Sequence, residues 1–179
     1  MTQIIQRRGK AVAASAEEAP EQYLTFLLHG EMFAVGILNV KEIIEYGNLT
    51  EIPMMPSFIR GVINLRGSVV PVIDLSCRFG NVTTEISKRT CIVIVEVQEG
   101  EFRHDIGIMV DAVSEVIEIP AGDIEPPPSF GAKIRADFIL GMGKVSGKFV
   151  IILNIVKVLS VDEIALLAKV TGSETGSAA

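Results

Sequence analysis

Two short apolar runs in the middle of the chain, on either side of a glycine-bearing break, predict a β-hairpin. The runs are Val62–Leu65 and Val69–Ile73, and both are rich in Val and Ile, which favour strands. The break, Arg66-Gly67-Ser68, contains a glycine that can adopt the positive φ of a tight turn. Arg66 would lie at the hairpin tip, where its charge must face outward. A guanidinium held in this way is suited to pairing with a carboxylate on another surface.

Further runs of the same kind predict an all-β protein. The expected strands cover residues 23–28, 32–35, 46–52, 90–97, 102–110, 111–119, 138–145 and 148–153. With the central hairpin these make about nine or ten short strands with turns roughly every 8–12 residues, which is typical of a small β-barrel or sandwich. Long helices do not alternate with these strands, so a doubly wound α/β fold is disfavoured.

One segment, residues 37–45, has a different period and predicts a short helix. Its apolar residues at positions 37, 40, 43 and 44 have helical spacing, and polar residues such as Glu42 lie on the other side. A helix this short that packs on one side cannot bury all of these apolar side chains, so apolar surface would remain free for a partner. Glu42 is then either a plain solvated charge or part of that surface.

Three other helical segments are expected. Ser57 can cap a single turn, and residues 75–80 form one turn that ends at Gly80. Ser160 and Glu163 form a capping box, which predicts a C-terminal helix over residues 160–170.

Both ends of the chain are expected to be disordered, over residues 1–19 and 171–179. Arg7, Arg8 and Lys10 precede an Ala-rich stretch, an order that faintly resembles a secretory signal. That stretch is short and acidic residues follow it at once, whereas a signal has a longer run of bulkier apolar residues. We therefore expect a cytoplasmic protein.

The composition narrows the class of protein. Hydrophobic residues make up 49% of the chain and the mean hydropathy is +0.44. No apolar run is longer than five residues, the length of runs 91–95 and 149–153. A membrane helix needs about 20 apolar residues, so none is expected. A net charge of −6 disfavours a nucleic-acid surface, which is normally basic. No CxxC or Cys-His pattern predicts a metal site. Cys77 and Cys91 are expected to be two reduced thiols of a cytosolic protein rather than a disulfide.

Three motifs suggest catalysis or ligand binding, and each fails on spacing or context. The glycines of residues 141–148 do not have the spacing of a phosphate-binding loop. Arg103-His104-Asp105 resembles part of a kinase catalytic loop but lacks the accompanying motifs. The carboxylates between residues 111 and 125 are divided between the two faces of a predicted strand, which does not make a metal cluster. We expect no cofactor, no metal and no enzymatic activity.

Four segments taken together resemble the CheW-like family of chemotaxis adaptors. They are ILNVKEI (37–43), FIRGVINLRGSVVPVIDL (58–75), VDAVSEVIEI (110–119) and ILGMGKVSGKFVIILNIVKVLS (139–160). The resemblance extends from about residue 22 to 167. It implies one domain over residues 20–170, with two five-stranded, SH3-like β-barrels that divide near residues 80–90 and pack through a hydrophobic seam. It also implies that the C-terminal helix lies against the first barrel.

The resemblance also implies a function. Members of this family couple chemoreceptors, the methyl-accepting chemotaxis proteins, to the histidine kinase CheA through its regulatory domain. By motif, the receptor-facing surface would include Ile37, Val40, Glu42, Gly61 and Arg66. Residues of the kinase contact are not placed. Two alternatives stay open: an adaptor in another motility or surface-sensing pathway, and a ligand-binding barrel.

Overall fold

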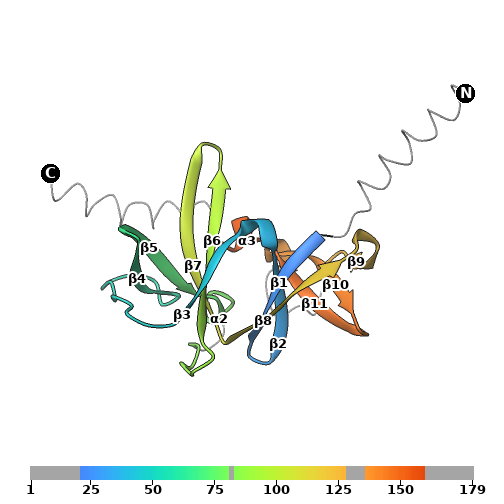
Figure 1. Ribbon diagram of the computed structural model, residues 1–179, viewed down its shortest axis with the longest axis horizontal. Helices are drawn as coiled ribbons and strands as arrows, with labels where there is room; N and C mark the ends of the chain where they lie inside the picture. The colour runs from blue at the N-terminus through green and yellow to red at the C-terminus, as the bar shows by residue number, and fades with distance from the viewer. Residues whose placement is uncertain (1–20, 81–82, 128–135, 160–179) are drawn as a thin grey trace, which may run out of the picture.

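The computed structural model describes residues 21–80, 83–127 and 136–159, which form two antiparallel-rich β-sheets packed together (Figure 1). The first sheet has the strand order β8-β1-β2-β11-β10-β9, and the second has the order β3-β6-β7-β5-β4. The strands of the first sheet are β1 (Glu21–Leu28), β2 (Glu31–Gly36), β8 (Ala112–Ile119), β9 (Ile124–Glu125), β10 (Ile139–Val145) and β11 (Lys148–Leu153). Those of the second are β3 (Val40–Glu45), β4 (Ile59–Leu65), β5 (Ser68–Asp74), β6 (Cys91–Glu99) and β7 (Phe102–Val110).

Short helical turns connect or follow these strands. They are η1 (Ile37–Asn39), α2 (Leu75–Arg78), η2 (Ala121–Asp123), η3 (Ala136–Phe138) and α3 (Ile155–Val158). The all-β, two-subdomain class expected from the sequence is confirmed, and so is the helical turn expected after β5. The first sheet differs from the expected five strands because the two-residue β9 adds a sixth.

The chain passes between the sheets twice, so the first sheet combines residues from both ends of the described chain. It takes β1 and β2 and then β8 to β11, whereas residues 40–110 supply the second sheet. The sequence interpretation placed the division near residues 80–90. The chain changes sheet instead at residues 36–40 and 110–112, because β6 and β7 pair with β3 and β5.

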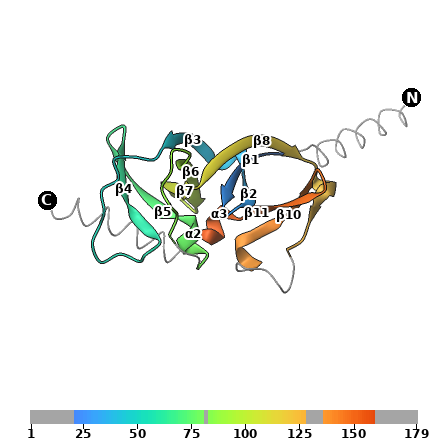
Figure 2. The same ribbon diagram turned by 90° about the horizontal axis from the view of Figure 1, so that it is seen from below.

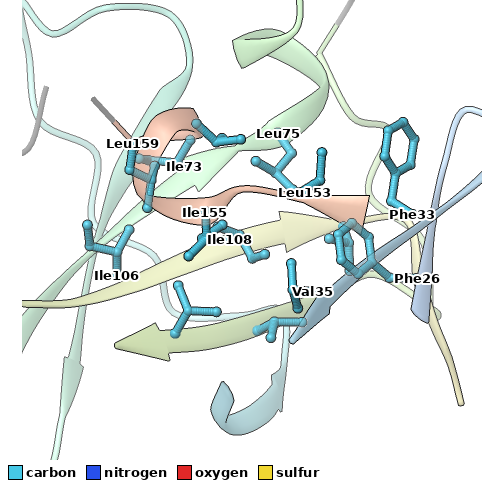
Figure 3. Packing of buried hydrophobic residues seen from close by; sticks show 14 of the residues in the cluster. Phe26, Phe33, Val35, Ile73, Leu75, Ile106, Ile108, Leu153, Ile155 and Leu159 are labelled. Atoms are coloured by element: carbon cyan, nitrogen blue, oxygen red, sulfur yellow. The ribbon is translucent and has the colours of Figure 1, made fainter. Parts of the chain in front are cut away.

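The central strands are buried on both faces, and the two faces belong to different cores. On β6, Ile92 and Ile94 point into the second sheet, whereas Val93 and Val95 point toward the first. The largest cluster lies between the sheets, and we call it the seam core (Figure 3). Its buried members are Leu24, Phe26, Leu28, Phe33, Val35, Ile59, Ile73, Leu75, Val93, Val95, Val97, Ile106, Ile108, Val110, Phe138, Leu153, Ile155, Val158 and Leu159.

A cation holds the two sheets together beside the seam core. Arg78 of α2 places its guanidinium 5.2 Å from the ring centroid of Phe58 and 4.8 Å from that of Phe138. Its Nε also donates a hydrogen bond of 2.9 Å to the carbonyl oxygen of Val158 in α3. Cation–π contacts of this kind contribute about 0.5–2 kcal/mol, depending on how far the cation is desolvated. Figure 2 shows α2 and α3 next to each other between the sheets.

The two sheets are built from equivalent segments. Residues 58–79 and 138–159 each form a bulged hairpin followed by a helical turn, and they align without a gap at a spacing of 80 residues. The turns contain Arg66-Gly67 and Ser146-Gly147, all four at positive φ. Asp74 and Asn154 then cap the helical turns with their side chains.

A second pair of equivalent segments lies where the chain enters each sheet. The sequences are VKEIIE in β3 and VSEVIE in β8, and Val40 and Val113 occupy corresponding register positions opposite Val95 and Phe26. Both strands carry a bulge directly after that valine. By this register, Glu42 corresponds to Glu115 and Ile43 to Val116.

The predicted helix over residues 37–45 is wrong. Only Ile37–Asn39 form a helical turn, of the 3-10 type, and Val40–Glu45 form β3. Val40, Ile43 and Ile44 are β-branched, and β6 offers a full edge for pairing, so the extended conformation wins over the weak helical period. Ile44 then packs into the core of the second sheet, and Ile43 faces outward.

Two smaller predictions also differ from the structure. Residues 46–52 were expected to form a strand but contribute a single bridge, Thr50 to Val62. The turn expected to be helical after Ser57 is closed by one hydrogen bond of 3.0 Å, from Ile59 N–H to the Pro56 carbonyl oxygen. The C-terminal helix predicted for 160–170 and the tails at 1–19 and 171–179 lie outside the described residues.

A substitution of Gly61 tests how closely the backbone of segment 47–52 packs against β4. Its φ is +150°, and a Cβ at this position would lie 2.2 Å from the Thr50 carbonyl oxygen. Gly61→Ala should therefore lower the free energy of unfolding by about 2 kcal/mol or more, measured by denaturant titration. Gly122→Ala, where a Cβ meets nothing within 4 Å, is the matched control and should change stability little. Equal effects of the two variants would contradict the close approach.

Candidate docking surface

Arg66 and Glu42 meet at the tip of the β4–β5 hairpin. Arg66 Nη1 donates to Glu42 Oε1 at 2.7 Å, and Nη2 donates to Oε2 at 3.0 Å, so the pair is bidentate. The hairpin pattern predicted that Arg66 pairs with a carboxylate on another surface; in the structure it pairs instead with Glu42 of the same chain. The Arg66 side chain is nevertheless 77% exposed, against 25% for Glu42. The outer part of the guanidinium is therefore open to solvent.

The local backbone explains why Arg66 stands at this tip. Arg66 and Gly67 have φ values of 53° and 85°, so both central residues of the two-residue turn are at positive φ, as in a type I′ hairpin. The Gly67 N–H donates to the Asn64 side-chain oxygen at 2.9 Å, which fixes the turn further. This rigid tip lets Arg66 reach β3, which closes the second sheet on itself.

Ile37 and Val40 have a different role from the charged pair. Both are partly buried and pack against the seam core. Their neighbours Leu38 and Ile43 are the exposed apolar residues of this segment, at 97% and 43% exposure. Leu38 falls outside the apolar positions of the helical period, so the sequence pattern does not indicate it. Ile43 was placed on the apolar face of the predicted helix; in the strand that forms instead, it lies on the outer face.

Gly61 is buried beneath the backbone of residues 50–51 and is not part of the exposed surface. The structure therefore brings Glu42 and Arg66 together at the surface and places Ile37 and Val40 just beneath it. Gly61 supports the hairpin from behind, because only a residue without a side chain allows the Thr50–Val62 bridge.

Lys41 adds a second set of charges on β3 that the sequence analysis did not single out. Its Nζ lies 2.9 Å from Asp105 Oδ2 on β7 and 3.7 Å from Glu96 Oε2 on β6. The hydrogen bond to Asp105, with the attraction of that carboxylate, raises the pKa of the Lys41 ammonium. The cluster ties β3 to two neighbouring strands of the sheet.

The other polar clusters of the described residues hold the structure together. Asp74 is fully buried; its carboxylate accepts hydrogen bonds from the Ser76 and Thr84 backbone N–H groups and faces Arg60 Nη1 at 3.4 Å. His29 Nε2 contacts Ser76 Oγ, but that hydroxyl is buried. In the parts of the chain that the structure describes, no group of three or more His, Cys, Asp or Glu is arranged to hold a metal ion.

The described residues also contain no helix that is both long and apolar enough to span a membrane. The candidate surface of this all-β protein has two exposed features. One is a rigid hairpin tip with an exposed, paired guanidinium, and the other is the pair of exposed apolar side chains, Leu38 and Ile43, on the segment that carries Glu42.

Comparison with known proteins gives the family. Residues 22–163 match the CheW-like domain. Chemotaxis protein CheW of Klebsiella aerogenes is 33% identical over 159 residues, which cover 89% of this chain and 93% of that protein. Protein FrzA of Myxococcus xanthus is 34% identical over 136 residues, covering 75% and 82%. The crystal structure of the scaffolding protein TtCheW from Thermoanaerobacter tengcongensis matches with a TM-score of 0.72 and 38% identity, covering 80% of this chain and 90% of that one. The chain belongs to the CheW-like family of chemotaxis adaptors.

The Arg66–Glu42 pair should contribute little to stability, because at least one partner is largely solvated. Arg66→Ala and Glu42→Ala should each lower the free energy of unfolding by less than about 1 kcal/mol, and a double-mutant cycle should give a coupling of about 0.2–1 kcal/mol that shrinks in salt. A coupling several times larger, measured by denaturant unfolding, would show that the pair is a structural element.

Proposed function

We propose that this protein is a cytoplasmic adaptor that couples methyl-accepting chemoreceptors to the histidine kinase CheA by binding both, without catalysis. The main support is that Glu42 holds the Arg66 guanidinium in place by two hydrogen bonds, while the Arg66 side chain remains mostly exposed. Leu38 and Ile43, on the segment that carries Glu42, add exposed apolar area. Arginine is one of the residue types in which interface hot spots are enriched.

The equivalence of the two sheets supports a binding role for Arg66. The β10–β11 hairpin forms the same positive-φ turn with Ser146 in place of Arg66. The turn therefore does not need a guanidinium, and the charge at the β4–β5 tip has a use other than folding. The outward N–H groups of Arg66 can bind a carboxylate or carbonyl of a receptor tip.

Coupling two proteins requires a second surface, and the first sheet offers one. Val116 on β8 and Phe149 on β11 are each 49% exposed and belong to the other subdomain. We assign the contact with the CheA regulatory domain to that sheet. Weak contacts of each surface become strong when many copies assemble side by side, because binding is then multivalent.

An adaptor for another sensing pathway is the second candidate, because one relative, FrzA, carries a name other than CheW. The surface would be the same and the partners different. A small-ligand barrel is disfavoured, because each sheet has its own cluster of buried apolar side chains. Ile63, Val70, Val72 and Ile92 lie among those inside the second sheet.

Binding measurements with charge-swapped variants test the proposal. Calorimetry with a receptor cytoplasmic fragment should show at least a tenfold loss of affinity for Arg66→Ala, corresponding to about 1.4 kcal/mol, with an unchanged melting temperature. Arg103→Ala, another exposed arginine, is the control and should bind normally.

The double variant Glu42→Arg with Arg66→Glu then separates two explanations. It keeps an ion pair at the tip but reverses the charge that a partner meets. If the receptor contacts the guanidinium directly, the swap should bind as poorly as Arg66→Ala. Restored binding would mean that the pair only holds the hairpin in place. If Arg66→Ala and the double variant both bind receptor and kinase fragments normally, the proposed docking surface is wrong.

A further inference from the structure

A surface groove lies where β1 begins, on the first sheet, and it is both acidic and apolar. Glu21 and Glu118 line it from the paired strands β1 and β8, and none of its lining residues is a cation. Ile37, Leu38 and Leu140 provide its apolar part, and Leu38 and Leu140 are 97% and 60% exposed. An occupant that complements this groove therefore brings both apolar side chains and positive charge.

The negative character of the groove also shows in Tyr23, which lines it. The Tyr23 hydroxyl donates a hydrogen bond of 3.1 Å to Glu21 Oε2. Burial, then this hydrogen bond and the charge of Glu21, raise the pKa of Tyr23 to about 12. The same carboxylate that disfavours a second negative charge here favours a cation.

The N-terminal segment of this chain has the matching chemistry. Ile4 and Ile5 are followed by Arg7, Arg8 and Lys10, and the first ten residues contain no carboxylate although the whole chain has a net charge of −6. The segment is joined directly to the groove, because Glu21 is both a lining residue and the first described residue. Residues 11–20 can span at most about 35 Å when extended, which is ample for residues 4–10 to turn back onto it.

We propose that residues 4–10 dock into this groove of their own chain and cover Ile37 and Leu38. The isoleucines pack against Leu38 and Leu140, and the three cations face Glu21 and Glu118. Residues 11–20 act as a tether of ten residues, which gives residues 4–10 an effective concentration at the groove on the order of millimolar. Even weak docking therefore populates the state in which the segment occupies the groove. Docking and receptor binding then compete, which makes the segment autoinhibitory. This second step rests on the proposed function, since it needs Ile37 and Leu38 to lie at the receptor surface.

The test uses the full chain with isotope-labelled methyl groups. Arg7→Glu, Arg8→Glu and Lys10→Glu together should shift the Leu38 and Leu140 methyl resonances and leave those of Val69 and Ile86 unchanged. The same charge reversal at Lys88, Arg89 and Arg103, all exposed, is the matched control and should leave Leu38 and Leu140 unchanged. Adding Glu21→Lys and Glu118→Lys to the triple variant should restore the original resonances. Unchanged Leu38 and Leu140 resonances in the triple variant would overturn the docking.

Two further readouts separate the occupants. Light scattering should give a monomer mass and resonances independent of protein concentration; a dimer whose resonances depend on dilution would assign the groove to a second copy and overturn the intrachain proposal. If only added receptor fragment moves the Leu140 resonance, the groove belongs to the partner and the proposal is likewise overturned.

Affinity for the receptor fragment tests the inhibitory step separately. The triple variant should bind at least threefold more tightly than the parent chain, because it no longer has to release the segment. Shifted Leu38 and Leu140 resonances with unchanged receptor affinity would support docking and overturn the competition, which places the error in the receptor surface. If the Leu38 and Leu140 resonances do not shift in the triple variant while receptor binding still depends on Arg66, docking is overturned and the proposed function stands.

Discussion

The structure depends on the seam core, the apolar cluster that both sheets share. Strands β1, β6 and β7 give one face to their own sheet and the other to this cluster, so they are buried on both sides. Separating the sheets would expose most of the largest apolar cluster in the described chain, and the hydrophobic effect opposes this strongly. The two sheets therefore act as a single folding unit. The chain also links them twice, because it passes from the first sheet to the second and back.

The candidate docking surface owes its rigidity to this core. Ile37 and Val40 are anchored on the seam core, so the exposed Leu38 and Ile43 between and beyond them are held by a backbone that cannot shift freely. Across the sheet, the Thr50–Val62 bridge and the Glu42 contact fix the hairpin that carries Arg66. A surface whose side chains are already ordered loses less entropy on binding, which favours affinity without a large buried area.

The sequence predicted what is local and missed what is distant. The hairpin around Arg66 was predictable because turn chemistry and β-branched runs act over a few residues. Residues 37–45 were misread because apolar positions 37, 40, 43 and 44 satisfy a helical period, and the pairing with β6 that decides the matter lies about 50 residues away. The Arg66–Glu42 contact and the interleaving of the sheets depend on long-range pairing for the same reason. The resemblance gave the five candidate residues as a set, and the residue pattern had already indicated Arg66 and Glu42; only the structure separates this surface pair from the buried Gly61.

The equivalence of the two sheets offers a way to divide fold from function within one molecule. Gly61 and Gly141 both follow a bulge and both lie where a Cβ would meet a neighbouring segment, so the shared glycine belongs to the hairpin architecture. Arg66 and Ser146 occupy the same turn position with the same backbone, yet only one carries a charge. A residue that differs between two copies of one architecture is free of that architecture's demands. By this criterion the hairpin architecture does not require the charge of Arg66, which supports the proposed binding role, and Glu42 supplies the carboxylate that orients the guanidinium.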